Sequence, residues 1–134
     1  MLDAVLVAFS CERGVVELYT GGAARRIARG APGTDAVVVS RGVQKALLDR
    51  RERVLVHGPA AAELATLVKH GVRAAMGAPL VAGNRLLGFI YVDDRARADR
   101  FDAAELDFLT AVAHLAAAAV DQVIDRLRLE SLAA

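Results

Sequence analysis

The three histidines and the single cysteine are the residues best able to carry out chemistry, but their spacing does not favour a shared site. His57, His70 and His114 are far apart, and no two of them have the separation of a helical metal-binding motif. The only cation near Cys11 is Arg13, so the sequence offers little to activate the thiol. We find neither a glycine-rich phosphate loop nor a nucleophile elbow. The sequence therefore predicts no catalytic residue, no metal ligand and no identifiable cofactor, with a small enzyme or a redox sensor as an alternative.

Four aspartates gather in the sequence between a hydrophobic segment and a helical one. They are Asp93, Asp94, Asp99 and Asp102. Carboxylates at such spacing could collect around a cation. They could equally belong to a solvated loop that caps the following helix, and we favour this second interpretation.

Composition limits the class of protein. The chain has 134 residues, enough for one domain over 1–134 with its own core, and its formal net charge of +1 gives no field that would attract nucleic acid. No run of about eighteen consecutive apolar residues occurs, which argues against a membrane span. One cysteine cannot form an internal disulfide, and the first residues lack a basic leader. We therefore expect a cytoplasmic domain without direct nucleic-acid or membrane partners.

The spacing of apolar and turn residues predicts a mostly antiparallel sheet. A β-branched and apolar segment precedes the turn residues Gly21-Gly22, and residues 23–29 can return as its partner strand. Gly83-Asn84 suits a two-residue hairpin between the two most hydrophobic segments. The predicted strands are 13–20, 23–29, 53–57, 72–81 and 86–92.

Four segments show helical signals. Residues 1–10 carry an apolar stripe and predict a shortened first helix. Ser40 predicts the cap of a helix over 40–50, and Pro59 with Gly71 brackets another over 58–71. The last helix has the clearest beginning, because Asp102 and Glu105 form a capping-box pattern. It is predicted over about 102–130.

Three segments carry a resemblance to a known family: VRAAMGAPL at 72–80, GNRLLGFIYVDD at 83–94 and FDAAELDFL at 101–109. With residues 39–56, which are similar to a helix and strand preceding the family's ligand loop, they make the chain resemble a GAF domain over nearly its whole length. This resemblance implies an α+β, GAF/PAS-like fold with a central antiparallel sheet of about five to six strands. The N- and C-terminal helices would pack on one face, and short helices and loops would cover the ligand-pocket face.

The resemblance also bears on the ligand and on catalysis. The asparagine-lysine pair of members that bind cyclic nucleotides would fall near Asp93-Asp94-Arg95 and is not present. One enzymatic GAF group reduces free methionine sulfoxide and needs several cysteines, which the lone Cys11 does not supply. The resemblance therefore implies a non-catalytic regulatory module of a bacterial signalling or transcription-regulatory protein, with an output domain elsewhere in the parent protein.

A ligand pocket of such a module would lie between one sheet face and the segments 40–49 and 58–71. Side chains of a strand alternate between faces, but burial on both sides hides which set faces the pocket. The candidate lining is therefore Met76 with Ala74 or Ala75, and Phe89 or Tyr91. The covering helix would add Leu64 and Leu67. These residues could instead only fill a core, which would leave a ligand-free structural dimerisation module as the alternative.

The last helix carries apolar residues at steps of three and four, the pattern of a coiled-coil seam. The series continues beyond what a domain of this size needs for its own core. We therefore expect a homodimer through this helix. The predicted seam is Leu109, Ala113, Ala116, Val120, Val123 and Leu127.

Overall fold

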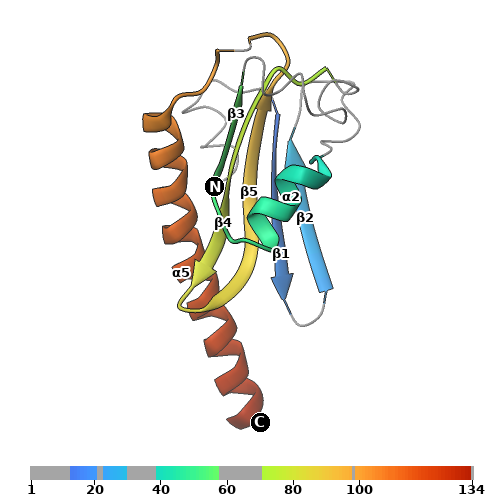
Figure 1. Cartoon of the computed structure of the whole chain (residues 1–134). Helices are drawn as coiled ribbons and strands as arrows, with labels where there is room; N and C mark the ends of the chain where they lie inside the picture. The colour runs from blue at the N-terminus through green and yellow to red at the C-terminus, as the bar shows by residue number, and fades with distance from the viewer. Residues whose placement is uncertain (1–12, 21–22, 30–38, 58–70, 98, 134) are drawn as a thin grey trace.

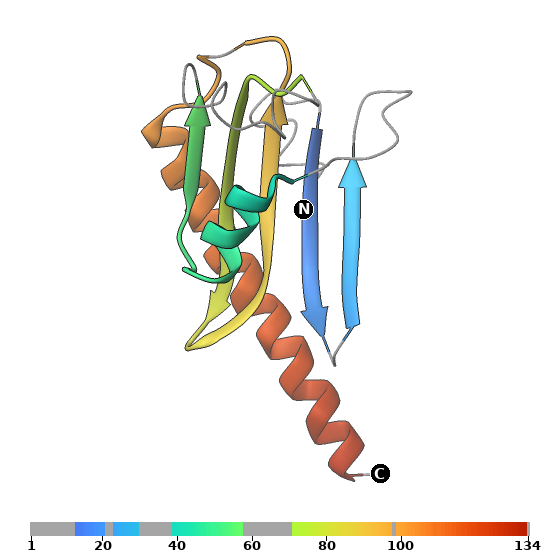
Figure 2. The same ribbon diagram turned by 45° about the vertical axis from the view of Figure 1, so that its right-hand side comes forward.

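Five antiparallel strands form one sheet with a helix on each face (Figures 1 and 2). The computed structural model describes residues 13–20, 23–29, 39–57, 71–97 and 99–133, and the element counts refer to these residues. The strands run in the order β2-β1-β5-β4-β3. Their bounds are β1 Arg13–Thr20, β2 Ala23–Arg29, β3 Val54–His57, β4 Ala74–Ala82 and β5 Arg85–Asp94, and the helices are α2 Arg41–Leu48 and α5 Ala103–Ala133.

The β4–β5 hairpin forms the centre of the sheet because its residues are apolar on both faces. Seven consecutive residues of each strand are buried. Gly83 opens the turn at a φ of 61°, which glycine adopts without the steric cost of a Cβ, and Ala82 pairs with Arg85 across it. The predicted hairpin is confirmed, as are the predicted strands 13–20 and 23–29.

Alternation along the strands divides the core into two layers. On the α5 side, Met76 and Ile90 pack with Leu109 of the helix. On the α2 side, Phe89 and Tyr91 pack with Leu47 of the shorter helix. Figure 2 shows α2 in front of the sheet and α5 behind it. The α+β, GAF-like class predicted from the sequence is confirmed.

The helical predictions have mixed outcomes. The helix expected over 40–50 ends at Leu48, and Arg51 takes a positive φ of 53° that stops any continuation. The helix expected near 102–130 runs from Ala103 to Ala133. As predicted, Asp102 caps it, because its Oδ1 accepts a hydrogen bond from the backbone N–H of Glu105 at 2.8 Å. The segments 1–10 and 58–71 lie outside the described residues, except Gly71.

Ser40 begins α2 by accepting a hydrogen bond from the backbone N–H of Val43, with 3.2 Å between oxygen and nitrogen. The serine is buried, so water cannot replace the lost acceptor. We expect Ser40→Ala to lower the free energy of unfolding by about 1 kcal/mol, measured by urea denaturation. Ser131→Ala, at an exposed position near the end of α5, should change it by less than about 0.5 kcal/mol. Equal effects of the two substitutions would contradict the assigned cap.

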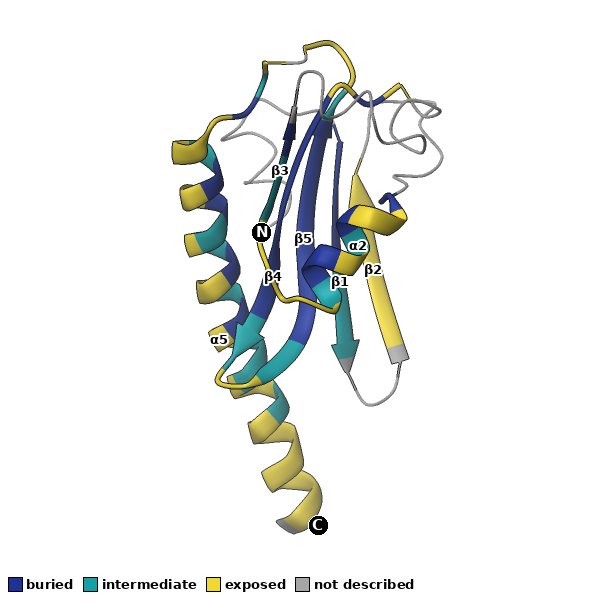
Figure 3. Cartoon of the chain, viewed as in Figure 1, coloured by how far each residue is buried: buried dark blue, intermediate teal, exposed yellow. Residues whose placement is uncertain are grey.

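Helix α5 is longer than the sheet it covers. Its inner side contacts the sheet, whereas its outer side and last turns are exposed (Figure 3). Ala103–Leu132 has 30 residues and a mean hydropathy of 1.5, so by length and composition alone it could cross a membrane. Because core helices of water-soluble proteins pass the same test, this is weak evidence for a membrane span.

Candidate functional site

The α2 face of the sheet contains a buried polar group where β1 begins and β5 ends. Arg13 pairs with Asp93 across the two strands, and Tyr91 lies two residues before Asp93 on the same face. The Arg13 Nε atom lies 3.3 Å from Asp93 Oδ1, and the Tyr91 hydroxyl donates a hydrogen bond to Asp93 Oδ2 at 3.0 Å. The exposed fractions of the Arg13 and Asp93 side chains are 2% and 0%, so the ion pair is shielded from water.

Burial sets the protonation behaviour of this group. It raises the pKa of the Asp93 carboxyl, although the positive charge of Arg13 and the hydrogen bond from Tyr91 oppose the shift. Burial also raises the pKa of Tyr91, and the neighbouring Asp93 carboxylate adds to that effect. The tyrosine therefore keeps its proton and acts as a donor.

The row of residues across the sheet at this level is otherwise small or apolar. Asp93 pairs with Ala75 on β4, and Ala75 pairs with Val56 on β3. Val15 is the next residue of β1 on this face and is fully buried. The charged guanidinium of Arg13 thus lies on a mostly apolar face of the sheet. This combination is typical of sites that hold a small molecule by one polar end and an apolar body.

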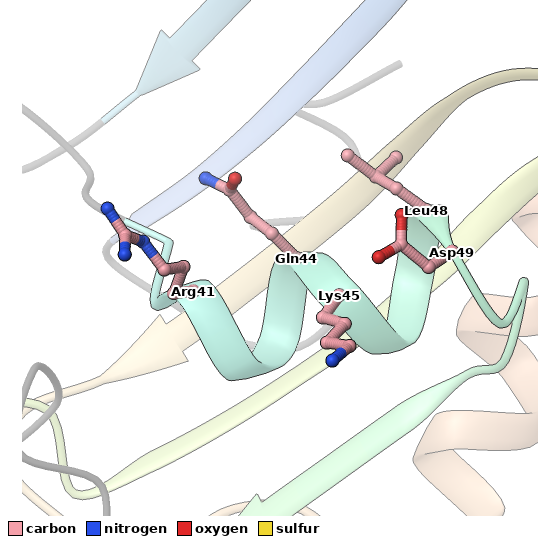
Figure 4. A pocket seen from close by; sticks show the side chains of 5 residues that line it. All are labelled: Arg41, Gln44, Lys45, Leu48 and Asp49. Carbon is pink, nitrogen blue, oxygen red and sulfur yellow. The ribbon is translucent and has the colours of Figure 1, made fainter.

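Helix α2 carries an open pocket of about 340 Å³ along its outer side. Figure 4 shows its lining side chains, which come from successive turns of the helix and its C-terminal end. Arg41 and Lys45 bring positive charge to this pocket, and Asp49 brings negative charge. The remaining lining residues are Gln44 and Leu48. The covering segment 58–71 predicted from the sequence lies outside the described residues, apart from Gly71.

The structure separates the predicted pocket residues onto two faces. Phe89 and Tyr91 lie on the α2 face together with Ala75. Ala74 and Met76 lie in the core layer on the α5 side, so the prediction that they share a pocket with Phe89 and Tyr91 is wrong. The reason is the period of two along β4, which sends neighbouring residues to opposite faces. The predicted lining residues Leu64 and Leu67 lie outside the described residues.

The four aspartates do not converge on a cation. Asp93 is buried against Arg13, and Asp102 caps α5. The other two form separate ion pairs, with 3.5 Å between Asp94 Oδ2 and Arg100 Nε and 3.3 Å between Asp99 Oδ1 and Arg97 Nε. Among the described residues, no group of three or more histidine, cysteine or acidic side chains could hold a metal ion.

The remaining reactive residues show no common site either. His114 is exposed on α5. Cys11, His70 and the side chain of His57 lie outside the part of the chain that the structure describes.

Sequence reasoning missed Arg13 as a site residue and placed Asp93 in a solvated loop. A signal was present, because Asp93 continues the alternation of Phe89 and Tyr91 at the end of the most hydrophobic segment. An aspartate in that position, in phase with two buried aromatic residues, needs a buried partner. Which cation supplies it depends on strand register, and only the fold shows that β1 pairs with β5.

The predicted dimer seam is wrong at its first two positions. Leu109 and Ala113 are fully buried against the sheet and cannot contact a partner. Ala116 and Val120 are partly buried on the same side. The seam therefore coincides with the core-facing side of α5 for most of its length.

Only the end of that seam is open to a partner. Val123 and Leu127 are exposed and line a groove of about 510 Å³ between the end of α5 and the β1–β2 pair. Leu18 and Arg25 contribute to this groove from the sheet.

Comparison with known proteins agrees with this architecture. The GAF domain family model matches residues 1–120. A comparison with curated proteins finds no match.

Similar solved structures include a GAF domain from Synechocystis in its photoproduct state, with a TM-score of 0.73, 20% identity, and 95% of this chain and 92% of that chain covered. A domain from Sinorhizobium meliloti assigned to a two-component sensor histidine kinase has a TM-score of 0.63, 24% identity and coverages of 98% and 90%. The blue-light-absorbing form of the PixJ GAF domain from Thermosynechococcus elongatus has a TM-score of 0.65, 16% identity and coverages of 98% and 84%. At these identities the likeness to the solved structures concerns the fold alone. The family model covers most of the sequence, and the chain therefore belongs to the GAF domain family.

Proposed function

We propose that this GAF domain is a non-catalytic sensory module that binds a small molecule on the α2 face of its sheet. It works in the cytoplasm as part of a bacterial signalling or transcription-regulatory protein and acts on an output domain through α5. The observation that carries the proposal is the buried Arg13–Asp93–Tyr91 group, because desolvating an ion pair costs several kcal/mol and adds little to stability by itself.

The pocket along α2 is a second place where a ligand could act on the same face. It lies on the outer side of the helix whose inner side packs against Phe89 and Tyr91. A ligand that displaced α2 would therefore change how the core layer on this face packs. Two members of the wider fold group, the Synechocystis and Thermosynechococcus domains, are described by their light-absorbing or photoproduct states, and the present chain shares their architecture.

A thermal-shift screen of the purified domain against a library of bacterial metabolites tests the binding proposal. A ligand at about 100 times its Kd stabilises the folded state by about 2.7 kcal/mol, which raises the Tm of a domain of this size by on the order of 10 °C. A hit is then measured by calorimetry. If no compound shifts the Tm, the alternative of a ligand-free dimerisation module replaces the sensory proposal.

Dimerisation through α5 is the second part of the proposal. The outer side of the helix, opposite the sheet, shows a stripe of small and large apolar residues at steps of four and three, interrupted by Gln122 and Asp125. All members are exposed, and Leu115 exposes 74% of its surface. We call this set the outer stripe: Ala104, Phe108, Ala111, Leu115, Ala118, Leu129 and Leu132.

The outer stripe is proposed to pair with the same stripe of a second copy. Alternating alanines and large residues suit close packing between two α5 helices. A ligand would then act by its different affinity for two arrangements of the paired helices.

Leu115→Glu tests the dimer. It places a charge in the centre of the outer stripe, so we expect the dimer dissociation constant to rise at least about tenfold, measured by sedimentation velocity over a concentration series. Ser131→Glu adds the same charge on the opposite side of α5 and should leave the constant unchanged. A wild-type domain that stays monomeric at high concentration, or equal effects of the two substitutions, would contradict this interface.

A further inference from the structure

The guanidinium group of Arg13 has more donors than the structure satisfies. It carries five N–H groups, all of them donors. Its Nε, Nη1 and Nη2 atoms are buried and have no hydrogen-bond partner within the part of the chain that the structure describes, and the same holds for Asp93 Oδ1. The 3.3 Å separation between Nε and Oδ1 is an ion-pair contact. A buried polar group without hydrogen-bond partners is costly, so an added acceptor would stabilise this group.

The arrangement indicates where that acceptor would bind. Asp93 lies on the Nε side of the guanidinium, and its second oxygen is held by the Tyr91 hydroxyl at 3.0 Å. Tyr91 and Asp93 thus orient the arginine from one side. Nη1 and Nη2 carry the N–H groups that face away from Nε, and a planar group with two oxygens would satisfy them in the geometry of bidentate carboxylate recognition.

We infer that the small molecule bound on the α2 face carries a carboxylate, held by the Nη1 and Nη2 edge of Arg13. This inference rests on the proposed sensory function and specifies its ligand class. Asp93 and Tyr91 are positioning residues for the guanidinium. Val15, Ala75 and Val56, which are buried on the same face, make the surroundings of this group apolar.

The buried charges favour a carboxylate over a phosphate. Arg13 and Asp93 together are neutral when both are ionised. A carboxylate brings one negative charge into this buried surrounding, whereas a phosphate brings nearly two at neutral pH, next to the Asp93 carboxyl. Repulsion inside a protein is poorly screened, so the second charge is disfavoured.

The test compares carboxylates with their amides. We would measure the Tm and the calorimetric affinity of the wild-type domain with formate, acetate, pyruvate, succinate and benzoate, and with the uncharged primary amide of each, which for succinate is the diamide. At least one carboxylate should bind while its amide, equal in shape but uncharged, does not. An amide that binds as tightly as its carboxylate would overturn the inference.

Substitution of the arginine assigns the binding to the site. Arg13→Lys keeps the positive charge but removes the planar pair of donor nitrogens. We expect a roughly 10- to 100-fold weaker affinity for the carboxylate that binds best. Arg25→Lys, on the α5 side of the sheet, is the matched control and should leave the affinity unchanged. Unchanged affinity in Arg13→Lys would overturn the inference.

A crystal structure of the wild-type complex with the same carboxylate is a readout that needs no variant. Carboxylate oxygens within hydrogen-bond distance of Nη1 and Nη2 support the inference, and binding elsewhere refutes it. If no carboxylate binds but uncharged metabolites do, the inference fails and the sensory function stands. If neither class binds, both fail.

Discussion

Gly88→Ala is expected to destabilise the domain by at least about 3 kcal/mol, or to prevent folding altogether. Gly88 lies in β5 at a φ of 150°, next to a register shift between Leu80 and Val81 of β4. An added Cβ would lie 1.9 Å from the backbone oxygen of Glu17 in β1. Backbone cannot move aside as a flexible side chain can, so β1 and β5 would have to separate.

The measurement is urea denaturation followed by circular dichroism, with Gly83→Ala as the control. Gly83 also has a positive φ of 61°, but an added Cβ there would contact no atom within 4 Å. In this variant the free energy of unfolding should fall only by the cost of a left-handed backbone conformation, about 1 to 2 kcal/mol. Equal losses in both variants would show that backbone conformation, and not contact with β1, determines the requirement for glycine at 88.

The second large effect concerns the buried ion pair. Asp93→Ala leaves the charged Arg13 guanidinium buried without its counter-ion, and we expect the free energy of unfolding to fall by about 3 to 5 kcal/mol. The loss would be measured by chemical denaturation of the variant and the wild type at the same pH and salt concentration.

The double substitution Arg13→Met with Asp93→Leu is the matched test. It removes both charges and keeps similar volumes, so most of the stability lost in Asp93→Ala should return. The same double variant should not bind carboxylates. If it were as unstable as Asp93→Ala, the loss would come from packing at these positions and not from an unpaired charge.

The sheet and its last helix could be predicted because their signals are local. Gly83 marks the hairpin, and Asp102 with Glu105 marks the beginning of α5. These signals depend on the conformations of a few neighbouring residues, which sequence encodes directly. The premature end of α2 at Leu48 was missed, because Asp49 and Arg50 have no helix-breaking side chain and the stop lies in the positive φ of Arg51.

The faces of the central strands could not be predicted. Neighbouring residues such as Ala74 and Ala75 are both fully buried, so hydrophobicity does not distinguish them. Pairing with β5 decides which one faces α2. A similar ambiguity affected α5, where a core-facing side and a dimer seam have nearly the same spacing, and the position of the sheet shows that Leu109 and Ala113 belong to the core.

The sequence by itself therefore determined the strands, the hairpin, the cap of α5 and the resemblance to the GAF family. Tertiary structure alone decided which side chains share a face and that Arg13 pairs with Asp93. The physical reason is distance along the chain. Turns and caps form between neighbours, whereas the buried ion pair joins residues of two strands far apart in sequence, and a shift of one residue in register would send each side chain to the opposite face.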